Sequence, residues 1–450
     1  MRLEAIRSGT PAFRRALQAL FARRLDDLGA LDHAVRKIID EVRRRGDRAL
    51  IDLTAKFDRV TLSTRSIRVS RAEIDSALDG LPSKERKSLE LAARRISTFH
   101  RRTLERGFTY RDRVGVTLGQ LVRPIDRVGI YVPGGSGAYP STVLMNAIPA
   151  RVAGVREIAM VTPPSPPARQ TGVLAAAAIA RVDEVYRIGG AQSIAALALG
   201  TRSIHRVDKI VGPGNAWVQT AKRLVYGLVD IDKMAGPSEI LVIADKNARV
   251  DWIAADLIAQ AEHGSGDESA TLLTDSEALA HGVIQALEDS LKDLPRAASV
   301  RQVLSKRCAV LVFKSLAEAV ELANKIAPEH LELDVARPKE WLDKVRCAGA
   351  VFLGAMSPAP LGDYLAGPNH VLPTGGSARF ASPLGAYDFI KRSSIIHATA
   401  RALNRLGPDV ARLARMEGLE GHARSIELRL KNGTTAGRTQ RKRNGDRTAA

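Results

Sequence analysis

The chain has 450 residues, of which 45% are hydrophobic and only 4% aromatic. This length allows two or three domains, and the abundance of Ala, Leu, Val and Ile favours helices packed on parallel strands over a β-sandwich. The formal net charge of +19 suggests a nucleic-acid partner, but no basic and aromatic stripe of the kind found on RNA-binding sheets occurs. No uninterrupted apolar run of about 18 residues occurs, which excludes a membrane-spanning helix.

The two ends of the chain are expected to lie outside the main core. Residues 1–22 lack the apolar region of a signal peptide and are expected to form an N-terminal helical segment. Residues 431–450 hold six Lys or Arg and one Asp without apolar periodicity, so we expect a disordered basic tail. Persistent, salt-dependent DNA binding after removal of this tail would favour a nucleic-acid-binding module, which is the alternative from another functional class.

The two cysteines indicate a reducing environment. Cys308 and Cys347 lie in apolar runs, and neither has a Cys or His nearby at metal-ligand spacing. We therefore expect two buried thiols, no disulfide and a cytoplasmic location.

The N-terminal half starts with helical periodicity and then alternates between strands and helices. Residues 31–104 repeat apolar positions every three or four residues and are expected to be largely helical. Strands are predicted at 114–122 and 127–132. Further strands at 157–162, 185–188 and 209–211 alternate with helices at 141–152, 170–181, 191–199 and from Asn215. This succession predicts βαβ units and a parallel sheet.

The C-terminal half continues the alternation and ends in smaller pieces. Strands are predicted at 239–244, 270–274, 309–313 and 350–353, with a helix over 251–263. Beyond residue 376 we expect loops and then short helices around 387–391 and 410–419. The chain is therefore predicted to be an α/β protein with two lobes and small terminal pieces.

Three predicted strand ends carry glycine pairs, at 133–137, 189–192 and 212–215. Glycine lets the backbone approach a phosphate, and the following helix N-terminus offers free N–H groups. The strict G-x-G-x-x-G pattern is absent, because Trp217 stands where the third glycine belongs. Each loop alone is an ordinary turn by default, whereas the three together indicate a cofactor site of unspecified type.

Several histidines lie near other candidate metal ligands. Gln260 and His263 are three residues apart at the end of a predicted helix and therefore share one face. Asp363 and His370 flank a segment rich in Gly and Pro, and His422 follows a short Gly- and Glu-containing stretch. Zinc accepts such nitrogen and oxygen donors in sites of about four ligands. Spacing alone, however, favours hydrogen-bonded structural histidines.

Glu329 and His330 are adjacent in a segment that is expected to be a loop after a helix and a proline. A histidine with a pKa of about 6.5 is suited to taking a proton at neutral pH, and the carboxylate offers a second proton acceptor. An exposed pair at a helix end is an equally good explanation.

Taken together, the motifs of this chain resemble the histidinol dehydrogenase family, and they occur in the family's order from about residue 25 to 430. The matching stretches are Tyr131-Val-Pro-Gly-Gly, Pro140-Ser-Thr-Val-Leu-Met145, Gly189-Gly-Ala-Gln192, Val211-Gly-Pro-Gly-Asn215, Ala235-Gly-Pro-Ser-Glu239, Gln260-Ala-Glu-His263, Ala327-Pro-Glu-His-Leu331, Gly362-Asp-Tyr, Asn369-His-Val-Leu-Pro-Thr374 and Glu417-Gly-Leu-Glu-Gly-His422.

The resemblance implies a fold of two α/β lobes with incomplete Rossmann-like parallel sheets, plus small N- and C-terminal helical pieces. On this basis we expect a first α/β lobe, with the metal and catalytic residues, at 23–130 and 240–381. A second lobe with the NAD-binding loops is expected at 131–239. Residues 382–430 are expected to form a C-terminal helical piece that contributes to the partner subunit.

The resemblance also implies roles for individual residues. Tyr131, Gln192 and Asn215 are expected to contact NAD+. One Zn²⁺ per subunit is expected to be held by Gln260, His263 and Asp363, with His422 reaching the site from the partner subunit of a homodimer with shared active sites. Glu329 and His330 match the catalytic acid–base pair. The substrate-contacting positions are Ser238, Gln260, His263, His330, Asp363, His370, Glu417 and His422.

The activity implied by the resemblance is the NAD-dependent four-electron oxidation of L-histidinol to L-histidine via L-histidinaldehyde, which completes histidine biosynthesis. The nearest alternative is a related zinc- and NAD-dependent dehydrogenase of another polar alcohol, such as a sulfonated diol. Ser238, His370, Glu417 and His422 favour histidinol, because they match the family's pocket for its amine and imidazole.

Overall fold

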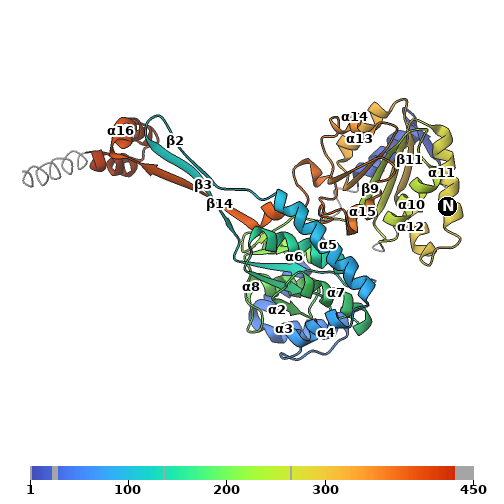
Figure 1. The fold of residues 1–450 in the computed structure, drawn as a ribbon, viewed down its shortest axis with the longest axis horizontal. Coiled ribbons are helices and arrows are strands. Elements are labelled where there is room, and N and C mark those ends of the chain that lie inside the picture. Colours follow the sequence, from blue (N-terminus) through green and yellow to red (C-terminus); the bar gives the residue numbers. More distant parts are fainter. Residues whose placement is uncertain (1–2, 23–28, 135–136, 264–265, 431–450) are drawn as a thin grey trace, which may run out of the picture. The chain divides into compact units, whose positions relative to one another are not determined.

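The structure is a computed structural model that describes residues 3–22, 29–134, 137–263 and 266–430. The predicted disordered tail at 431–450 lies outside these described residues. The chain divides into two compact units. The first comprises Met1–Leu104 and Ile125–Phe389, and the second comprises Glu105–Pro124 and Ile390–Ala450. Figure 1 labels their helices and strands.

The first unit contains a six-stranded parallel sheet in the order β1-β11-β10-β9-β12-β13. Its strands are β1 (Ala5–Arg7), β9 (Glu239–Ala244), β10 (Ser269–Thr274), β11 (Cys308–Val312), β12 (His330–Asp334) and β13 (Ala350–Leu353). Apart from the edge strand β1, this is the Rossmann order 3-2-1-4-5, whose switch point lies between β9 and β12.

Helices cover both faces of this sheet, and a buried apolar cluster lies under each layer. One face carries α10 (Val250–Ala261), α11 (Glu277–Ser290), α12 (Ala297–Arg307) and the short α15 (Ala359–Tyr364). The other face carries α1 (Pro11–Ala22), α13 (Leu316–Ile326) and α14 (Pro338–Leu342).

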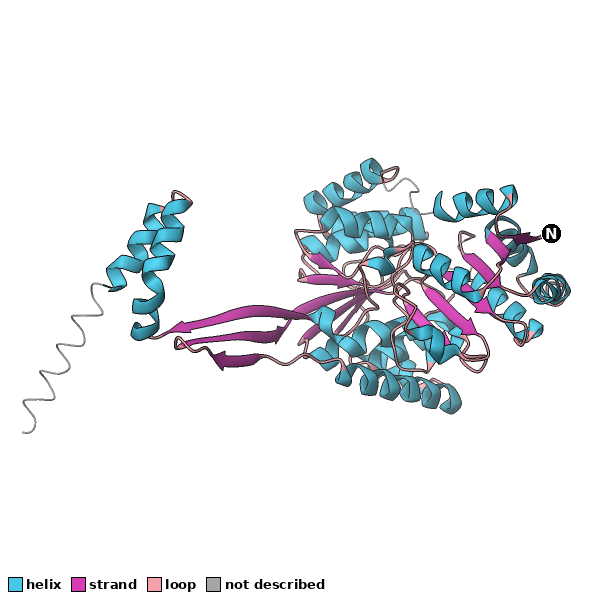
Figure 2. Cartoon of the chain, turned by 90° about the horizontal axis from the view of Figure 1, so that it is seen from above, coloured by secondary structure: helices cyan, strands magenta, loops and turns pink. Residues whose placement is uncertain are grey.

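The first unit also contains a five-stranded parallel sheet in the order β6-β5-β4-β7-β8, which again is the order 3-2-1-4-5. Its strands are β4 (Arg127–Tyr131), β5 (Glu157–Val161), β6 (Glu184–Tyr186), β7 (Lys209–Val211) and β8 (Asp230–Ile231). Figure 2 shows helices flanking the strands of both parallel sheets. The predicted class, α/β with two incomplete Rossmann-like lobes, is therefore confirmed.

The helices over residues 32–102 pack on the five-stranded sheet. The expected domain boundaries instead place residues 23–130 in the lobe with the metal and catalytic residues. One helical layer holds α2 (Asp32–Arg45), α3 (Asp47–Asp58), α8 (Gly190–Leu199) and α9 (Ala216–Val225). The other holds α4 (Arg71–Asp79), α5 (Ser83–Arg102), α6 (Pro140–Ala153) and α7 (Pro167–Ile179). Periodicity reveals that a helix has an apolar face, but it does not reveal which sheet that face covers.

The second unit is an antiparallel sheet followed by helices. Its strands are β2 (Phe108–Arg111), β3 (Val116–Pro124) and β14 (Ile390–Ala398), in the order β14-β3-β2. The helix α16 (Ala400–Met416) follows, and residues 420–430 are helical as well. The short helix predicted around 387–391 is present as a 3₁₀ helix, η2 (Ala386–Phe389), but it ends earlier than predicted because β14 begins at Ile390. β14 is largely exposed and lacks apolar alternation, so only its pairing with β3 reveals it as a strand.

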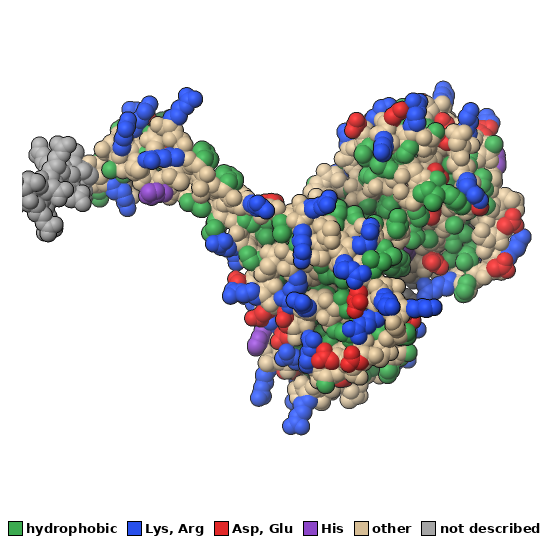
Figure 3. All heavy atoms as spheres, viewed as in Figure 1, with side chains coloured by type: hydrophobic (Ala, Val, Ile, Leu, Met, Phe, Trp, Pro, Cys, Tyr) green, Lys and Arg blue, Asp and Glu red, His purple; other side chains and the backbone are tan. Residues whose placement is uncertain are grey.

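Three expectations from composition can be compared with the structure. No helix among the described residues is long and apolar enough to cross a membrane, and the cytoplasmic location stays a prediction. Cys308 and Cys347 are present as thiols, and they are half-buried rather than fully buried. Figure 3 shows Lys and Arg side chains spread over this face of the first unit and interleaved with Asp and Glu, which is typical of a solvated surface.

Candidate active site

The predicted catalytic residues and several predicted metal ligands meet at the amino edge of the six-stranded sheet. His330 is the first residue of β12, and Glu329 precedes it. The helices α10 and α15 follow strands β9 and β13, so they run back towards the amino edge and deliver Gln260 and Asp363 there. This edge is unusual, because open α/β sheets usually bind ligands at the carboxyl edge. The expectation of a loop is wrong for His330, because His330 begins β12. The alternative of an exposed pair is wrong as well, because both side chains are buried.

Three histidines of this region share one hydrogen-bonding pattern. The Nδ1 atoms of His263, His330 and His370 lie 3.0, 3.1 and 2.8 Å from the backbone carbonyl oxygens of Gln260, Glu239 and Asp363, respectively. A carbonyl oxygen can only accept, so each Nδ1 is a protonated nitrogen, and in the neutral form of each ring Nε2 carries the lone pair. This arrangement is typical of imidazoles that bind a metal or take a proton.

Glu329, His330 and Asp363 form a compact charged cluster. The Oε2 atom of Glu329 lies 3.5 Å from Nδ1 of His330 and accepts the backbone N–H of Glu239 at 2.8 Å. On the other side of the ring, Nε2 of His330 lies 3.5 Å from Oδ1 of Asp363. The imidazole is thus placed between two carboxyl groups from different elements.

Burial and charge shift the pKa values of this cluster in a consistent way. Burial raises the pKa of Glu329 to about 8, although the nearby His330 opposes the shift. Burial alone lowers the pKa of His330, but the carboxylates of Glu329 and Asp363 raise it to about 9. The pKa of Asp363 is lowered, because the effect of burial is outweighed by His330 and by the charges of His370 and His263. A cation bound by Asp363 would offset the negative charge of this carboxylate and would thereby lower the pKa of His330.

The donor set of Gln260, His263 and Asp363 fits a zinc ion chemically, since it offers an amide oxygen, an imidazole nitrogen and a carboxylate. Among the described residues, the Nε2 atom of Gln260 is buried and has no hydrogen-bond partner, so this end of the carboxamide makes no hydrogen bond to the surrounding protein. No group of three or more His, Cys, Asp or Glu residues arranged for a metal occurs among the described residues. Of the three predicted ligands in this unit, only His263 and Asp363 are of these residue types. A zinc site would therefore also need the amide oxygen of Gln260 and a further ligand such as His422 of another subunit.

The three glycine loops lie at the carboxyl edge of the five-stranded sheet. Tyr131 ends β4 and is buried, and a hydrogen bond from the backbone of Gly190 reaches its hydroxyl group, whose pKa burial raises to about 12. Gln192 lies in the first turn of α8 and is also buried. Asn215 caps α9 by accepting the backbone N–H of Val218 at 3.1 Å. β4 and β7 flank the switch point of this sheet, where dinucleotides bind in related folds.

A buried ion pair holds the third glycine loop, and the sequence analysis missed it. Lys222 of α9 pairs with Asp232, and both side chains are shielded from solvent. Lys222 also donates to the carbonyl oxygen of Gly212 at 2.9 Å, while the N–H of Gly212 donates to Asp232 at 2.9 Å. Gly212 adopts a φ of +113°, and a Cβ there would overlap the carbonyl oxygen of Tyr131. A lysine ten residues after the glycine, on an apolar helix face, was the available signal.

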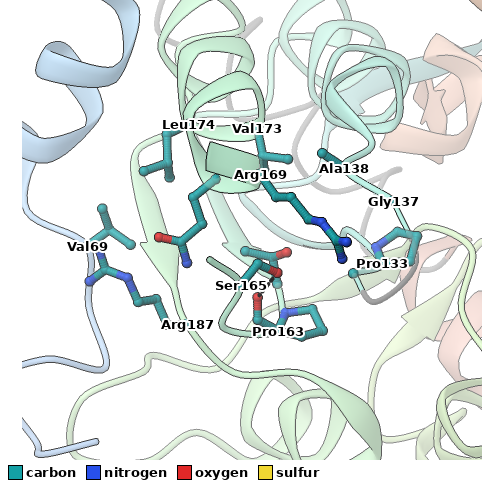
Figure 4. A pocket seen from close by; sticks show the side chains of 13 residues that line it. Val69, Pro133, Gly137, Ala138, Pro163, Ser165, Arg169, Val173, Leu174 and Arg187 are labelled. Atoms are coloured by element: carbon teal, nitrogen blue, oxygen red, sulfur yellow. Dashed lines mark hydrogen bonds between the residues drawn. The ribbon is translucent and has the colours of Figure 1, made fainter. Parts of the chain in front are cut away.

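A small open pocket lies at the ends of β4, β5 and β6 (Figure 4). Pro133 follows β4, Thr162 and Pro163 follow β5, and Arg187 follows β6. Arg169 of α7 also lines the pocket. Pro163 packs closely against the second glycine loop, so this cationic pocket adjoins the predicted cofactor loops.

Comparison with known proteins decides the family. The model of the histidinol dehydrogenase family matches residues 22–430. The chain belongs to the histidinol dehydrogenase family. It is 48% identical over 421 residues to histidinol dehydrogenase from Dechloromonas aromatica, covering 93% of this chain and 97% of that protein. It is 50% identical over 420 residues to the enzyme from Syntrophotalea carbinolica, with the same two coverages.

A crystal structure of histidinol dehydrogenase from Elizabethkingia anophelis has the same fold, with a TM-score of 0.89 and 35% identity over 96% of this chain and 98% of that one. The predicted family and activity are therefore confirmed, and the protein is an NAD-dependent oxidoreductase of histidine biosynthesis. The alternative substrate, a sulfonated diol, finds no support in these comparisons.

The remaining predicted residues of this histidinol dehydrogenase lie in two places. Ser238 precedes β9 and is half-buried, and its carbonyl oxygen accepts the N–H of Ser269. Glu417 and His422 belong to the second unit and are exposed. Glu417 follows α16, and His422 lies on the helical stretch 420–430. Within the first unit the structure thus brings together Glu329, His330, Asp363 and His370, with His263 near enough to affect two of them. Gln260 is linked to this group through its backbone carbonyl oxygen, which lies 3.0 Å from Nδ1 of His263.

Proposed function

We propose that this histidinol dehydrogenase holds one Zn²⁺ per subunit through Gln260, His263 and Asp363, with His422 of the partner subunit as a further ligand. The observation that carries this proposal is the shared orientation of the three histidines, whose Nδ1 atoms are bound to carbonyl oxygens at the edge where Asp363 lies. When bound, the ion would hold the amino and imidazole nitrogens of histidinol and orient its carbinol carbon.

The surface of the second unit supports a homodimer with shared active sites. Leu406, Val410 and Leu413 of α16 are exposed and repeat at the spacing of one helix face. Met416 and Leu419 continue this exposed apolar surface towards His422. Exposed apolar surfaces of this kind mark protein interfaces. A second copy of the chain is the occupant that would also explain an exposed histidine at a predicted ligand position.

We further propose that NAD+ lies on the loops of Tyr131, Gln192 and Asn215. The location of Tyr131 and Asn215 beside the switch point supports this role. Arg169 and Arg187 line the neighbouring pocket and would suit the negative charge of the dinucleotide, although Arg187 already pairs with Glu73 at 2.5 Å.

In the proposed mechanism, His330 would take the hydroxyl proton of histidinol, and NAD+, when bound, would supply the acceptor for the hydride of the carbinol carbon. Glu329 then takes a proton from the water that adds to the aldehyde carbonyl, and the carbonyl oxygen receives the proton held by His330, which frees His330 for the second oxidation. His330 accepts the hydroxyl proton of the hydrate as the second hydride leaves for a second NAD+. Ser238, His370 and Glu417 would contact the substrate, and the buried setting of Glu329 and His330 would keep the aldehyde in one site.

Mixed dimers test the shared metal site. His263→Ala and His422→Ala subunits should each lose zinc and activity when pure. If equal amounts are refolded together, half of the dimers are mixed and each has one intact site, so about a quarter of the wild-type zinc and activity should return. Recovery of neither quantity, in a sample shown to contain mixed dimers, would refute the sharing of ligands between subunits.

A further inference from the structure

A buried carboxyl group lies one layer away from the active site, on the same face of β12 as His330. Side chains alternate along a strand, so His330, Glu332 and Asp334 face α10, whereas Leu331 and Leu333 pack into the opposite core. Glu332 is buried, although its strand neighbours in register, Val242 and Phe352, are apolar. A carboxyl group in such surroundings is costly unless it is hydrogen-bonded.

Glu332 contacts both helices that deliver the predicted metal ligands. Its Oε1 atom accepts the backbone N–H of Ala359 at 2.7 Å, which is the first residue of α15. Its carboxyl group is also hydrogen-bonded to the side chain of Asp256, a half-buried residue of α10. These contacts connect β12, α15 and α10 through a single side chain.

The spacing along the three elements matches. Asp256 precedes Gln260 by four residues, Ala359 precedes Asp363 by four, and Glu332 follows His330 by two. Four residues of helix rise about 6 Å, and two residues of strand rise about 6.6 Å. The contacts of Glu332 with Asp256 and Ala359 therefore lie about one helical turn from Gln260, Asp363 and His330, measured along the direction of β12.

We propose that Glu332 is a positioning residue, which fixes α10 and α15 against β12 and thereby sets the distances among Gln260, Asp363 and His330. The proposal builds on the metal site proposed above and adds a residue outside it. Glu332 touches neither the substrate nor the ion in this role. It acts through the N-terminus of α15, whose first N–H has no partner within its own helix, and through Asp256.

The chemistry of the contact with Asp256 identifies the best conservative variant. Two carboxyl groups can share a hydrogen bond only when one of them is protonated, and burial raises the pKa of both Glu332 and Asp256. A glutamine at position 332 offers an oxygen to the N–H of Ala359 and an N–H₂ group to an ionised Asp256. A leucine fills a similar volume and makes neither contact.

The experiment compares Glu332→Leu, Glu332→Gln and Val310→Ala in the full-length holoenzyme. Val310 is fully buried in the apolar cluster between the six-stranded sheet and α10. It lies on β11, which is separated from β12 by β9 and β10. The readouts are zinc affinity, from competition with a chromophoric chelator, kcat for histidinol and the melting temperature. The expected result is about 10- to 100-fold weaker zinc binding in Glu332→Leu, with near-wild-type binding in Glu332→Gln. Val310→Ala should lower the melting temperature without weakening zinc binding.

Wild-type zinc affinity and kcat in Glu332→Leu would overturn the proposal, and so would equal zinc loss in Val310→Ala at a matched melting temperature. If the wild type itself holds no zinc, the metal proposal fails separately. The positioning role is then judged by kcat for histidinol, which should fall about tenfold in Glu332→Leu and recover in Glu332→Gln. If Glu332→Leu does not fold, Asp256→Ala removes the contact with α10 alone and should weaken zinc binding or lower kcat in the same direction.

Discussion

Replacing Lys222 with methionine should destabilise the protein far more than the loss of a surface ion pair. The side chains of Lys222 and Asp232 are 0% and 1% exposed, so the variant leaves a carboxylate without its counter-ion in the interior. Removing one partner of a buried pair costs about 3–5 kcal/mol. The pKa of Asp232 is lowered in the native protein, because Lys222 and Lys233 outweigh the effect of burial. Without Lys222 this pKa rises, so the loss of stability should grow with increasing pH.

The same substitution should weaken cofactor binding. Lys222 donates to the carbonyl oxygen of Gly212, and a hydrogen bond from a charged donor contributes about 1.5–3 kcal/mol. If about half of that free energy restrains the loop that carries Asn215, KM for NAD+ should rise about 4- to 12-fold. KM for histidinol should change much less, because the residues proposed to contact the substrate lie on other elements. Steady-state kinetics with each substrate varied in turn measures both effects.

Lys209→Met is the matched control. Lys209 pairs with Asp230 at 3.0 Å between the neighbouring strands β7 and β8, but Asp230 is 51% exposed, and so its charge stays hydrated in the variant. The expected cost is below about 1 kcal/mol, with KM for NAD+ unchanged. Equal losses of stability in the two variants would refute the argument from burial. An unchanged KM for NAD+ in Lys222→Met would refute the positioning of the glycine loop.

Three further predictions concern other parts of the site. Gly212→Ala should raise KM for NAD+ and lower the melting temperature, because its Cβ would meet the carbonyl oxygen of Tyr131; an unaltered enzyme would contradict the close approach. Glu329→Gln should slow aldehyde oxidation about 10²- to 10⁴-fold and lower the NADH formed per histidinol from two towards one. Unchanged kinetics of aldehyde oxidation would show that Glu329 does not activate the water. The raised pKa values of Glu332 and Asp256 favour the protonated native state, so their contribution to stability is present at acidic pH and is lost as pH rises through those values. Melting temperatures should therefore fall less steeply with pH in Glu332→Gln than in the wild type, and identical slopes would contradict this.

The sequence located the candidate residues, but it did not reveal their environments. Glu329 and His330 were recognised as a possible proton-transfer pair, with an exposed helix end as an equal alternative. Their burial, and the position of the imidazole between Glu329 and Asp363, follow from the packing of α15 against β12. A pattern of residue types carries no information on which carbonyl fixes a ring nitrogen. For the same reason, the sequence did not reveal the structural roles of Lys222 and Glu332, since their partners lie on other elements.

The sequence by itself determined the family, the α/β class, most strands of both parallel sheets and the glycine loops, because these depend on local periodicity, on turn chemistry and on contiguous motifs. Tertiary structure alone decided the rest. It assigned α2–α5 to the five-stranded sheet, paired β14 with β3 over nine residues of distant sequence, and placed Glu329 and His330, the proposed proton-transfer pair, at the amino edge of the six-stranded sheet. These features depend on which apolar faces and which unpaired polar groups meet in space, and chain order does not encode that directly.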